Sequence, residues 1–233
     1  MTTYVLIHGA ADGAWYWHLV ESELHRRGHG VVAMDLPCDD DSAGLSEYAD
    51  TVVDAIGGRS NLVVVAQSFG GFTGPLVCDR VSVDLLILVA GMIPAPGEPP
   101  DDWWKNTGYE RAKHEQDEHD GTGGANDDAI ATFLHDVPPD LAADAIRRAR
   151  DQSSTPMDTP WPLEAWPDVP TRFLLCRDDR FFPAELMRRV AHDRLGITPD
   201  EIDGGHCIAL SRPKELADRL EAFVADVNEN GRG

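Results

Sequence analysis

The feature that most constrains the fold is an apolar run that ends in a serine between small residues. Residues 63–67 read Val-Val-Val-Ala-Gln, and Ser68 is followed by Phe-Gly-Gly. Consecutive apolar residues are typical of a strand buried on both faces, and a helical pattern follows directly. A strand that turns straight into a helix tolerates only small residues beside the corner, and it pushes the corner side chain out of the sheet. The pattern predicts a nucleophile elbow at Ser68, although phosphate loops and ordinary tight turns share it.

Strand-like segments alternate with helix-like segments on both sides of this corner. The predicted strands are the apolar segments 4–7, 31–34, 63–67, 85–89 and 173–176 and a short segment at 197–202. Apolar strands that alternate with helices indicate an α/β fold, with a mostly parallel sheet of about six strands and helices on both faces. A chain of 233 residues is long enough for one such domain with a sizeable core.

The alternation breaks between residues 94 and 167, where no strand is predicted. The features of this segment are proline clusters, a charged run at 110–120, a glycine turn at 121–124 and helical pieces at 127–136 and 140–150. An insertion of this length between two strands of one sheet is more typical of a lid than of a disordered loop. We therefore expect a core formed by residues 1–93 and 168–233, with a helical cap (lid) at 94–167.

Composition argues against several classes of partner and site. The formal net charge of −21 argues against nucleic acid and anionic membranes, because phosphates would be repelled. No long apolar run and no signal peptide are recognised, which predicts a cytoplasmic protein without a membrane span. The four cysteines are far apart and form no CxxC pair, which is typical of free thiols and offers no zinc-ligand spacing. We expect neither metal nor cofactor, and the oligomeric state stays open, a homodimer included.

Polar side chains follow several predicted strands, whose carboxyl ends share one crevice in a doubly wound sheet. These residues are His8, Asp35, Ser68, Asp178, Asp179 and His206. A serine hydroxyl needs an imidazole to remove its proton, and the imidazole needs a carboxylate to hold its tautomer. His206 lies in a glycine-containing turn after a strand and is the candidate base, whereas His192 lies among arginines in a predicted surface helix. Either Asp178 or Asp179 can supply the carboxylate.

The order serine, aspartate, histidine is that of the α/β-hydrolases. The segments 6–10, 13–17, 68–71, 176–179 and 204–206 together resemble the branch of that superfamily that holds plant methylesterases and hydroxynitrile lyases. The likeness covers the whole sheet and is weak across the predicted cap. It implies an esterase that acts on a small-molecule ester without a cofactor.

The resemblance also implies roles for individual residues. In that branch the acid stands three residues after the cysteine that ends a strand, which makes Asp179 the match and Asp178 the runner-up. The backbone N–H groups of Ala10 and Phe69 match the oxyanion hole of the family. His8 would hold its loop in place and take no part in the chemistry.

Two positions distinguish hydrolysis from the lyase reaction. Hydroxynitrile lyases carry Thr where this chain has Gly9, and Lys where it has Cys207. Both lyase-specific groups are missing, which favours ester hydrolysis by a triad of Ser68, His206 and Asp179. The alternatives are lactone, amide or C–C cleavage or a lyase-like reaction by the same triad, and a ligand-binding member of the fold without catalysis.

The substrate pocket is the least constrained part of the site. Trp103, Phe133 and Trp161 in the predicted cap are expected either to line an apolar acyl or alcohol pocket or to form the core of the cap. Gln67 stands where the branch usually has His, a change that removes no chemistry. The sequence does not name the acyl and alcohol groups, because they depend on the cap.

Overall fold

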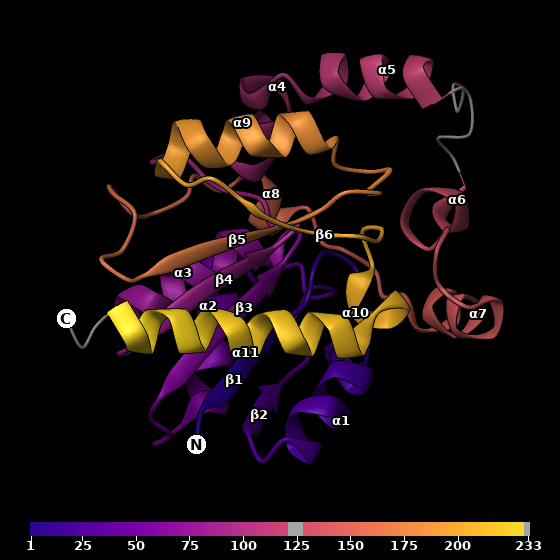
Figure 1. Ribbon diagram of the computed structural model, residues 1–233. Coiled ribbons are helices and arrows are strands. Elements are labelled where there is room, and N and C mark those ends of the chain that lie inside the picture. Colours follow the sequence, from indigo (N-terminus) through magenta and orange to yellow (C-terminus); the bar gives the residue numbers. More distant parts are fainter. Residues whose placement is uncertain (121–127, 231–233) are drawn as a thin grey trace.

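Six parallel strands form one sheet at the centre of the molecule (Figure 1). The computed structural model describes residues 1–120 and 128–230. The strands are β1 (Thr3–Ile7), β2 (Gly30–Ala33), β3 (Leu62–Gln67), β4 (Leu85–Val89), β5 (Thr171–Cys176) and β6 (Asp200–Ile202). Their order in the sheet is β2-β1-β3-β4-β5-β6, and each neighbouring pair is parallel. The predicted parallel sheet of six strands is confirmed.

Helices cover both faces of this sheet. They are the 3-10 helix η1 (Ala14–Trp17), α1 (His18–Arg26), α2 (Leu45–Ile56), α3 (Gly70–Arg80), α9 (Ala184–Leu195), α10 (Ile208–Ser211) and α11 (Pro213–Asn230). Buried residues of α2, α3 and α9 belong to one hydrophobic core, and those of α1, α10 and α11 belong to another. Among the described residues, no helix is long and apolar enough to cross a membrane.

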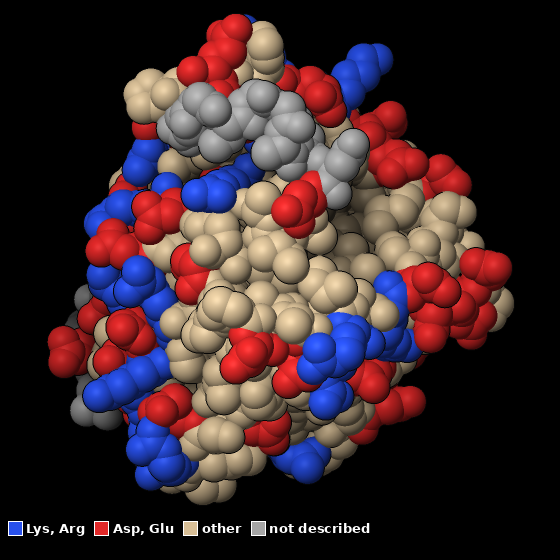
Figure 2. All heavy atoms as spheres, turned by 90° about the vertical axis from the view of Figure 1, so that its right-hand side faces the viewer, with Lys and Arg blue, Asp and Glu red and all other residues tan. Residues whose placement is uncertain are grey.

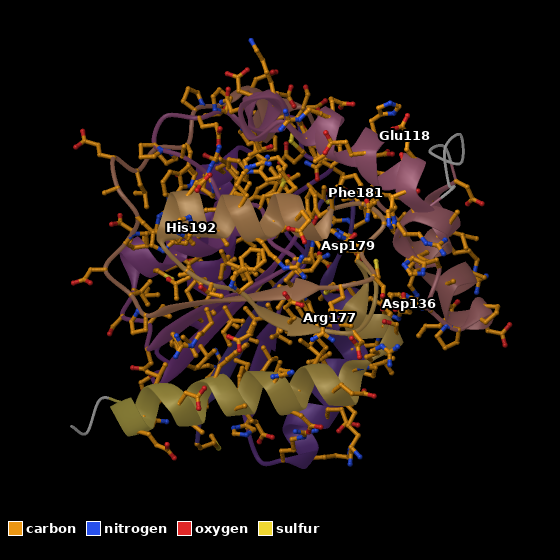
Figure 3. All side chains as sticks on the ribbon, turned by 45° about the horizontal axis from the view of Figure 1, so that its top comes forward. Glu118, Asp136, Arg177, Asp179, Phe181 and His192 are labelled. Atoms are coloured by element: carbon orange, nitrogen blue, oxygen red, sulfur yellow. The ribbon has the colours of Figure 1, made fainter. Side chains whose placement is uncertain are left out.

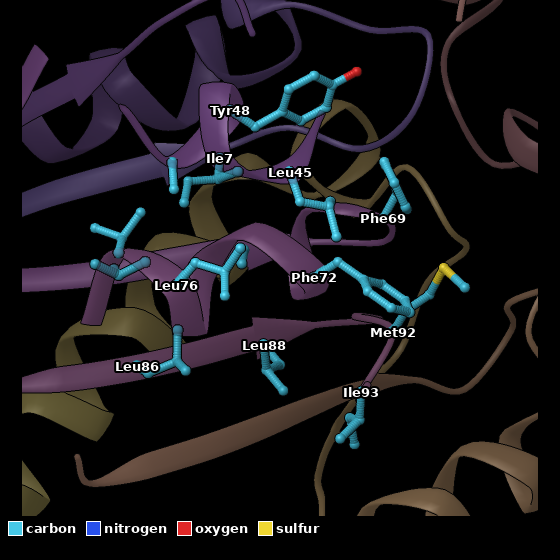
Figure 4. Packing of buried hydrophobic residues seen from close by; sticks show 14 of the residues in the cluster. Ile7, Leu45, Tyr48, Phe69, Phe72, Leu76, Leu86, Leu88, Met92 and Ile93 are labelled. Carbon is cyan, nitrogen blue, oxygen red and sulfur yellow. The ribbon is translucent and has the colours of Figure 1, made fainter. Parts of the chain in front are cut away.

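Alternate side chains of each central strand enter the two different cores. In β3, Val64 lies in the core with α2 and α3, whereas Val63 and Val65 lie in the core with α1 and α11. Figure 4 shows the first of these cores, where side chains of the strands, α2 and α3 interdigitate. Successive side chains of a strand point to opposite faces, so a strand buried on both sides must be apolar throughout. This is why the strands were recognisable as unbroken apolar runs.

The segment between β4 and β5 is helical. Its helices are α4 (Pro100–Thr107), α5 (Tyr109–Asp120), α6 (Ala129–Phe133), α7 (Pro139–Arg148) and α8 (Thr155–Asp158). In Figure 1, α4 and α5 lie beside α9, whereas α6 and α7 lie beyond the carboxyl ends of the strands. The start of the predicted helix at 127–136 and the predicted glycine turn at 121–124 lie outside the described residues. The division into a core and a separate cap stays a prediction.

Helices α4 and α5 were not predicted from the sequence. Proline and two aspartates in the first turn of α4 favour a helix start, and Gly108, with φ of 73°, ends it. Ion pairs one helical turn apart, such as Arg111 with Glu115, support α5. Residues 109–120 carry almost no apolar stripe, so the periodicity that reveals most helices is absent there.

Candidate active site

Ser68 occupies a strained corner between β3 and α3. Its φ is 50°, in the left-handed region that residues with a side chain rarely adopt. The backbone N–H groups of Gly71 and Met92 donate to the carbonyl oxygen of Ser68, over 3.0 and 2.9 Å. The N–H of Ser68 itself donates to Val89 O over 3.3 Å. These three bonds hold the corner conformation that the sequence pattern predicts, with the hydroxyl directed out of the sheet.

Glycines after Ser68 allow the backbone segments to approach one another. A Cβ placed on Gly71 would lie 1.9 Å from Met92 O, and one placed on Gly70 would lie 2.8 Å from His8 O. Backbone atoms cannot move aside as a flexible side chain can, so no larger residue fits here without a shift of the chain. Close packing therefore explains the small residues of the motif.

The structure brings Ser68, His206 and Asp179 into one hydrogen-bonded chain. Ser68 Oγ lies 3.0 Å from His206 Nε2, and His206 Nδ1 lies 2.8 Å from Asp179 Oδ2. The three residues are 8, 4 and 2% exposed. The carboxylate holds a proton on Nδ1, which leaves Nε2 free to accept the hydroxyl proton of Ser68. This arrangement can activate a serine as a nucleophile.

Backbone groups hold the Asp179 carboxylate in place. Its second oxygen, Oδ1, accepts the N–H groups of Phe181 and Phe182, over 2.8 and 3.0 Å. The rings of these two phenylalanines, and that of Phe133 from α6, lie 5.2 to 5.5 Å from the ring centre of His206. Figure 3 shows Asp179 and Phe181 side by side at this end of the sheet. The imidazole is thus enclosed by aromatic rings that limit its contact with water.

Asp178, the alternative acid, lies on the other side of the histidine loop. Its Oδ2 accepts the N–H of Gly204 over 2.9 Å, and its own N–H donates to Gly204 O over 3.0 Å. Asp178 is exposed, and it also holds the backbone of the loop that carries His206.

The sequence analysis did not identify two further residues here: Asp136 bonds the loop that carries His206, and His135 bonds the backbone of Asp178. Asp136, which follows α6, accepts the N–H of Gly205 on Oδ2 over 2.8 Å, and His135 Nε2 donates to Asp178 O over 2.9 Å. In Figure 3, Asp136 lies on the same side of the molecule as Asp179. Nothing in the local sequence of 135–136 indicates this role, since the contact joins residues about 70 positions apart.

The predicted oxyanion-hole residues lie on either side of Ser68. Phe69 precedes α3, so its N–H is one of the donors that a helix start leaves unpaired. Within the described residues, the N–H groups of Ala10 and Phe69 donate to no other protein atom. Ala10 lines the cavity above Ser68. Both donors therefore stay available to a substrate oxygen.

His8 supports the loop that carries Ala10. It is 1% exposed, its Nδ1–H donates to Gly9 O over 2.7 Å, and its Nε2 accepts the N–H of Leu36 over 3.0 Å. This pair of bonds requires a neutral ring, and burial lowers the pKa of His8 to about 4, which keeps it neutral. The contacts of His8 are those of a residue that holds a loop.

A cavity of about 370 Å³ opens above Ser68. Figure 2 shows a hollow in an uncharged area on the face of α6 and α7, with acidic and basic side chains around it. Most of its walls are alkyl or aromatic side chains, namely those of Phe133, Leu134, Ala145, Ile146, Phe181 and Leu210. The polar residues that line it are Asp12, Gln67, Ser68, His206 and Cys207. A cavity of this size and lining suits a small, largely apolar ligand.

Of the three aromatic residues expected near the substrate, only Phe133 lines this cavity. Trp103 and Trp161 are 0 and 1% exposed and lie in the core on the other side of the sheet. Their indole N–H groups donate to Ile93 O and Phe72 O, over 3.0 and 3.1 Å. The two tryptophans are core residues that belong to one cluster with strands of the sheet, and neither lines the cavity above Ser68.

Two other chemistries lack support at this site. Burial, and next the charge of Asp12, raise the pKa of the Cys207 thiol well above its usual value, so it is not a ready nucleophile. Within residues 1–120 and 128–230, no group of three or more His, Cys, Asp or Glu side chains is arranged to hold a metal ion.

Comparisons with known proteins find similar sequences and a similar fold. The model of the "Alpha/beta hydrolase family" matches residues 4–219. Methylesterase 9 of Arabidopsis thaliana is 24% identical, with 94% of this chain and 97% of that protein covered. Norfluorocurarine synthase 2 of Strychnos nux-vomica is 26% identical, with 96% of each chain covered. The crystal structure of polyneuridine aldehyde esterase superposes with a TM-score of 0.77 at 17% identity, covering 96% of this chain and 99% of that one, and so shares the fold.

Proposed function

This chain belongs to the alpha/beta hydrolase family, and from that premise we propose that it is a serine esterase that cleaves a small carboxylic ester. The observation that carries the proposal is the hydrogen-bonded chain from Ser68 through His206 to Asp179, at 3.0 and 2.8 Å. Relatives named methylesterases support a carboxylic ester hydrolase.

The first half of the reaction forms an acyl-enzyme. Ser68 Oγ attacks the carbonyl carbon while its proton passes to His206 Nε2, and the positive charge on the ring is stabilised by Asp179. The carbonyl oxygen gains negative charge, which the N–H groups of Ala10 and Phe69 stabilise; one such donor is typically worth roughly 10²–10³ in rate. The alcohol then leaves with the proton from His206.

The second half releases the acid. A water molecule gives a proton to His206 Nε2 and attacks the acyl carbon, and the bond between that carbon and Ser68 Oγ breaks as His206 returns the proton. The carboxylic acid departs and Ser68 is regenerated. Every proton in this cycle moves through Nε2, so the reaction needs no cofactor.

Replacement of the nucleophile is the direct test. Ser68→Ala should fold normally and lose nearly all hydrolysis of p-nitrophenyl acetate, measured as p-nitrophenol release. Ser60→Ala, on an exposed turn, is the matched control and should keep wild-type activity. A Ser68→Ala enzyme with most of its activity would refute the mechanism.

A fluorophosphonate probe should label wild type and not Ser68→Ala, whereas a non-catalytic binding protein would stay unlabelled.

The lyase alternative is disfavoured by the space around Gly9. A Cβ placed on Gly9 would lie 2.6 Å from Gln67 Oε1 and 3.0 Å from Ser68 Cβ, so the Thr of the hydroxynitrile lyases would fit only if the Gln67 side chain moved. Some relatives are named synthases, so the reaction also needs a direct comparison of substrates. Product analysis on matched ester, lactone, amide and cyanohydrin substrates should give turnover highest on the ester.

We also propose that residues 94–167 act as the substrate-facing cap and that the protein works in a reducing compartment, the cytoplasm. Phe133 and Ile146 from this segment line the cavity, which supports the first point. Cys38, Cys78 and Cys176 are free thiols, as is Cys207, which supports the second.

A further inference from the structure

One charged side chain lines the cavity above Ser68, whose walls are otherwise mostly apolar. Asp12 follows the loop of the predicted oxyanion hole and, of the described residues that line the cavity, it alone carries a carboxyl group. Its carboxylate acts on the thiol of Cys207, another lining residue, and raises the pKa of that thiol. The Asp12 carboxyl is therefore close to the walls of the substrate cavity and has no role in the mechanism above.

The protein itself provides little for this carboxylate. Asp12 Oδ1 accepts the N–H of Gly13 over 2.8 Å, and no other described residue donates to either oxygen. Arg150, whose charge acts on Asp12, donates its hydrogen bonds to Leu36 O over 2.8 Å and to Asp39 Oδ1 over 2.6 Å. The charge of Asp12 thus lies beside an apolar cavity without an ion pair to any residue that the structure describes.

Such a carboxylate is costly to keep ionised. Burial raises the pKa of Asp12 to about 6; the negative charge of Asp35 adds to the rise, and the Gly13 N–H and Arg150 oppose it. An unpaired buried charge is stabilised when a ligand supplies the opposite charge. Asp12 is therefore suited to a cationic ligand group.

Two other features favour a cation. The amide oxygen of Gln67, which also lines the cavity, accepts a hydrogen bond from none of the described residues, so it too is an acceptor without a donor. The net charge of −21 attracts cations and repels anions at long range. Both features, like the charge of Asp12, favour a cationic ligand.

We propose that Asp12 is a specificity-determining residue that selects esters carrying a cationic, amine-derived group, bound by its carboxylate while the ester carbonyl lies at Ser68. The apolar walls formed by Phe133, Ile146 and Leu210 accept the hydrocarbon between the two groups. This inference rests on the proposed esterase function for its catalytic part, but the binding of the cation does not.

The test compares two esters of nearly the same shape that differ in charge. They are p-nitrophenyl 4-(trimethylammonio)butanoate and its neutral carbon analogue, p-nitrophenyl 5,5-dimethylhexanoate. Wild type should favour the cationic ester in kcat/KM, and Asp12→Asn should reduce the ratio of the two values about tenfold. Asp41→Asn, an exposed residue, changes the net charge equally and should leave the ratio unchanged. An equal ratio in wild type and Asp12→Asn would overturn the proposal.

Binding separates this inference from the proposed function. Ser68→Ala and Ser68→Ala/Asp12→Asn are titrated with both esters by calorimetry, where no turnover occurs. A preference for the cation that disappears with Asp12 supports the inference even if wild type hydrolyses neither ester, in which case only the proposed function fails. Equal binding of the cation with and without Asp12 overturns the inference.

Acidification gives an independent readout. Asp35, Arg150, Tyr16, Cys38 and Cys207 are the described titratable or charged groups whose electrostatic interactions involve Asp12. The quaternary ammonium group is charged at every pH, so a pH-dependent preference must come from the protein. As the pH falls through about 6, Asp12 gains a proton and the preference should decline in wild type but not in Asp12→Asn. A preference equal at pH 5 and pH 8 contradicts the assignment.

Discussion

The corner around Ser68 and the helices between β4 and β5 differ sharply in how they are packed. At the corner, Gly70 and Gly71 are buried against backbone atoms, and Ser68 is held by three backbone hydrogen bonds. Helix α6, by contrast, has no buried residue, and Ile130 and Ile146 in α6 and α7 are 45 and 44% exposed.

The difference separates two requirements of an enzyme site. Reacting atoms must be held within a fraction of an ångström, and closely packed strands provide that precision. A wall that receives a substrate needs apolar surface more than rigidity, which loosely packed helices can supply. Asp136 connects the two regions, because it follows α6 and its carboxylate accepts a hydrogen bond from the backbone beside His206.

The strongest way to break the corner is to add one methyl group. Gly71→Ala places a Cβ 1.9 Å from Met92 O, a clash that backbone movement alone can relieve, so we expect a loss of about 4 kcal/mol or more in the free energy of unfolding. Gly58→Ala is the control, because a Cβ there meets nothing within 4 Å. Urea denaturation of both variants checks this; equal stabilities would mean that the corner is not closely packed.

The next largest effect should distinguish two adjacent carboxylates. Asp179→Asn removes the group that holds the proton on His206 Nδ1, and kcat for p-nitrophenyl acetate should fall about 10⁴-fold. Asp178→Asn keeps an oxygen that can accept the Gly204 N–H, so we expect less than about a tenfold loss. The opposite ranking would assign the acid to Asp178.

A smaller effect should show how far the segment after α6 contributes to the site. Asp136→Ala removes the acceptor for the Gly205 N–H, and a hydrogen bond worth about 1.4 kcal/mol corresponds to a tenfold lower kcat with little change in KM. Asp136→Asn keeps an acceptor oxygen and should restore most of kcat. Asp140→Ala, an exposed change in α7, is the control. If Asp136→Ala raises KM and leaves kcat unchanged, the residue does not position His206.

Much of the sheet was predictable, because the burial of a strand shows in residues that are neighbours in the sequence. The strand expected at 85–89 coincides with β4, and the strand expected at 63–67 lies within β3. Burial on both faces makes such a strand apolar at nearly every position, and an apolar run can be seen in a short stretch of sequence. Helix α5 escaped prediction because its residues show no such pattern.

The sequence by itself determined the family, the parallel sheet and the three residue types that the chemistry requires, because strand burial and the strained corner leave direct marks on neighbouring residues. Only the tertiary structure decided which of two adjacent aspartates meets His206, that Trp103 and Trp161 belong to the core, and that Asp12 shares the cavity with Ser68. These outcomes depend on contacts between residues far apart in the chain. Such contacts are set by how the elements pack in three dimensions, and neighbouring residues in the sequence do not reveal them.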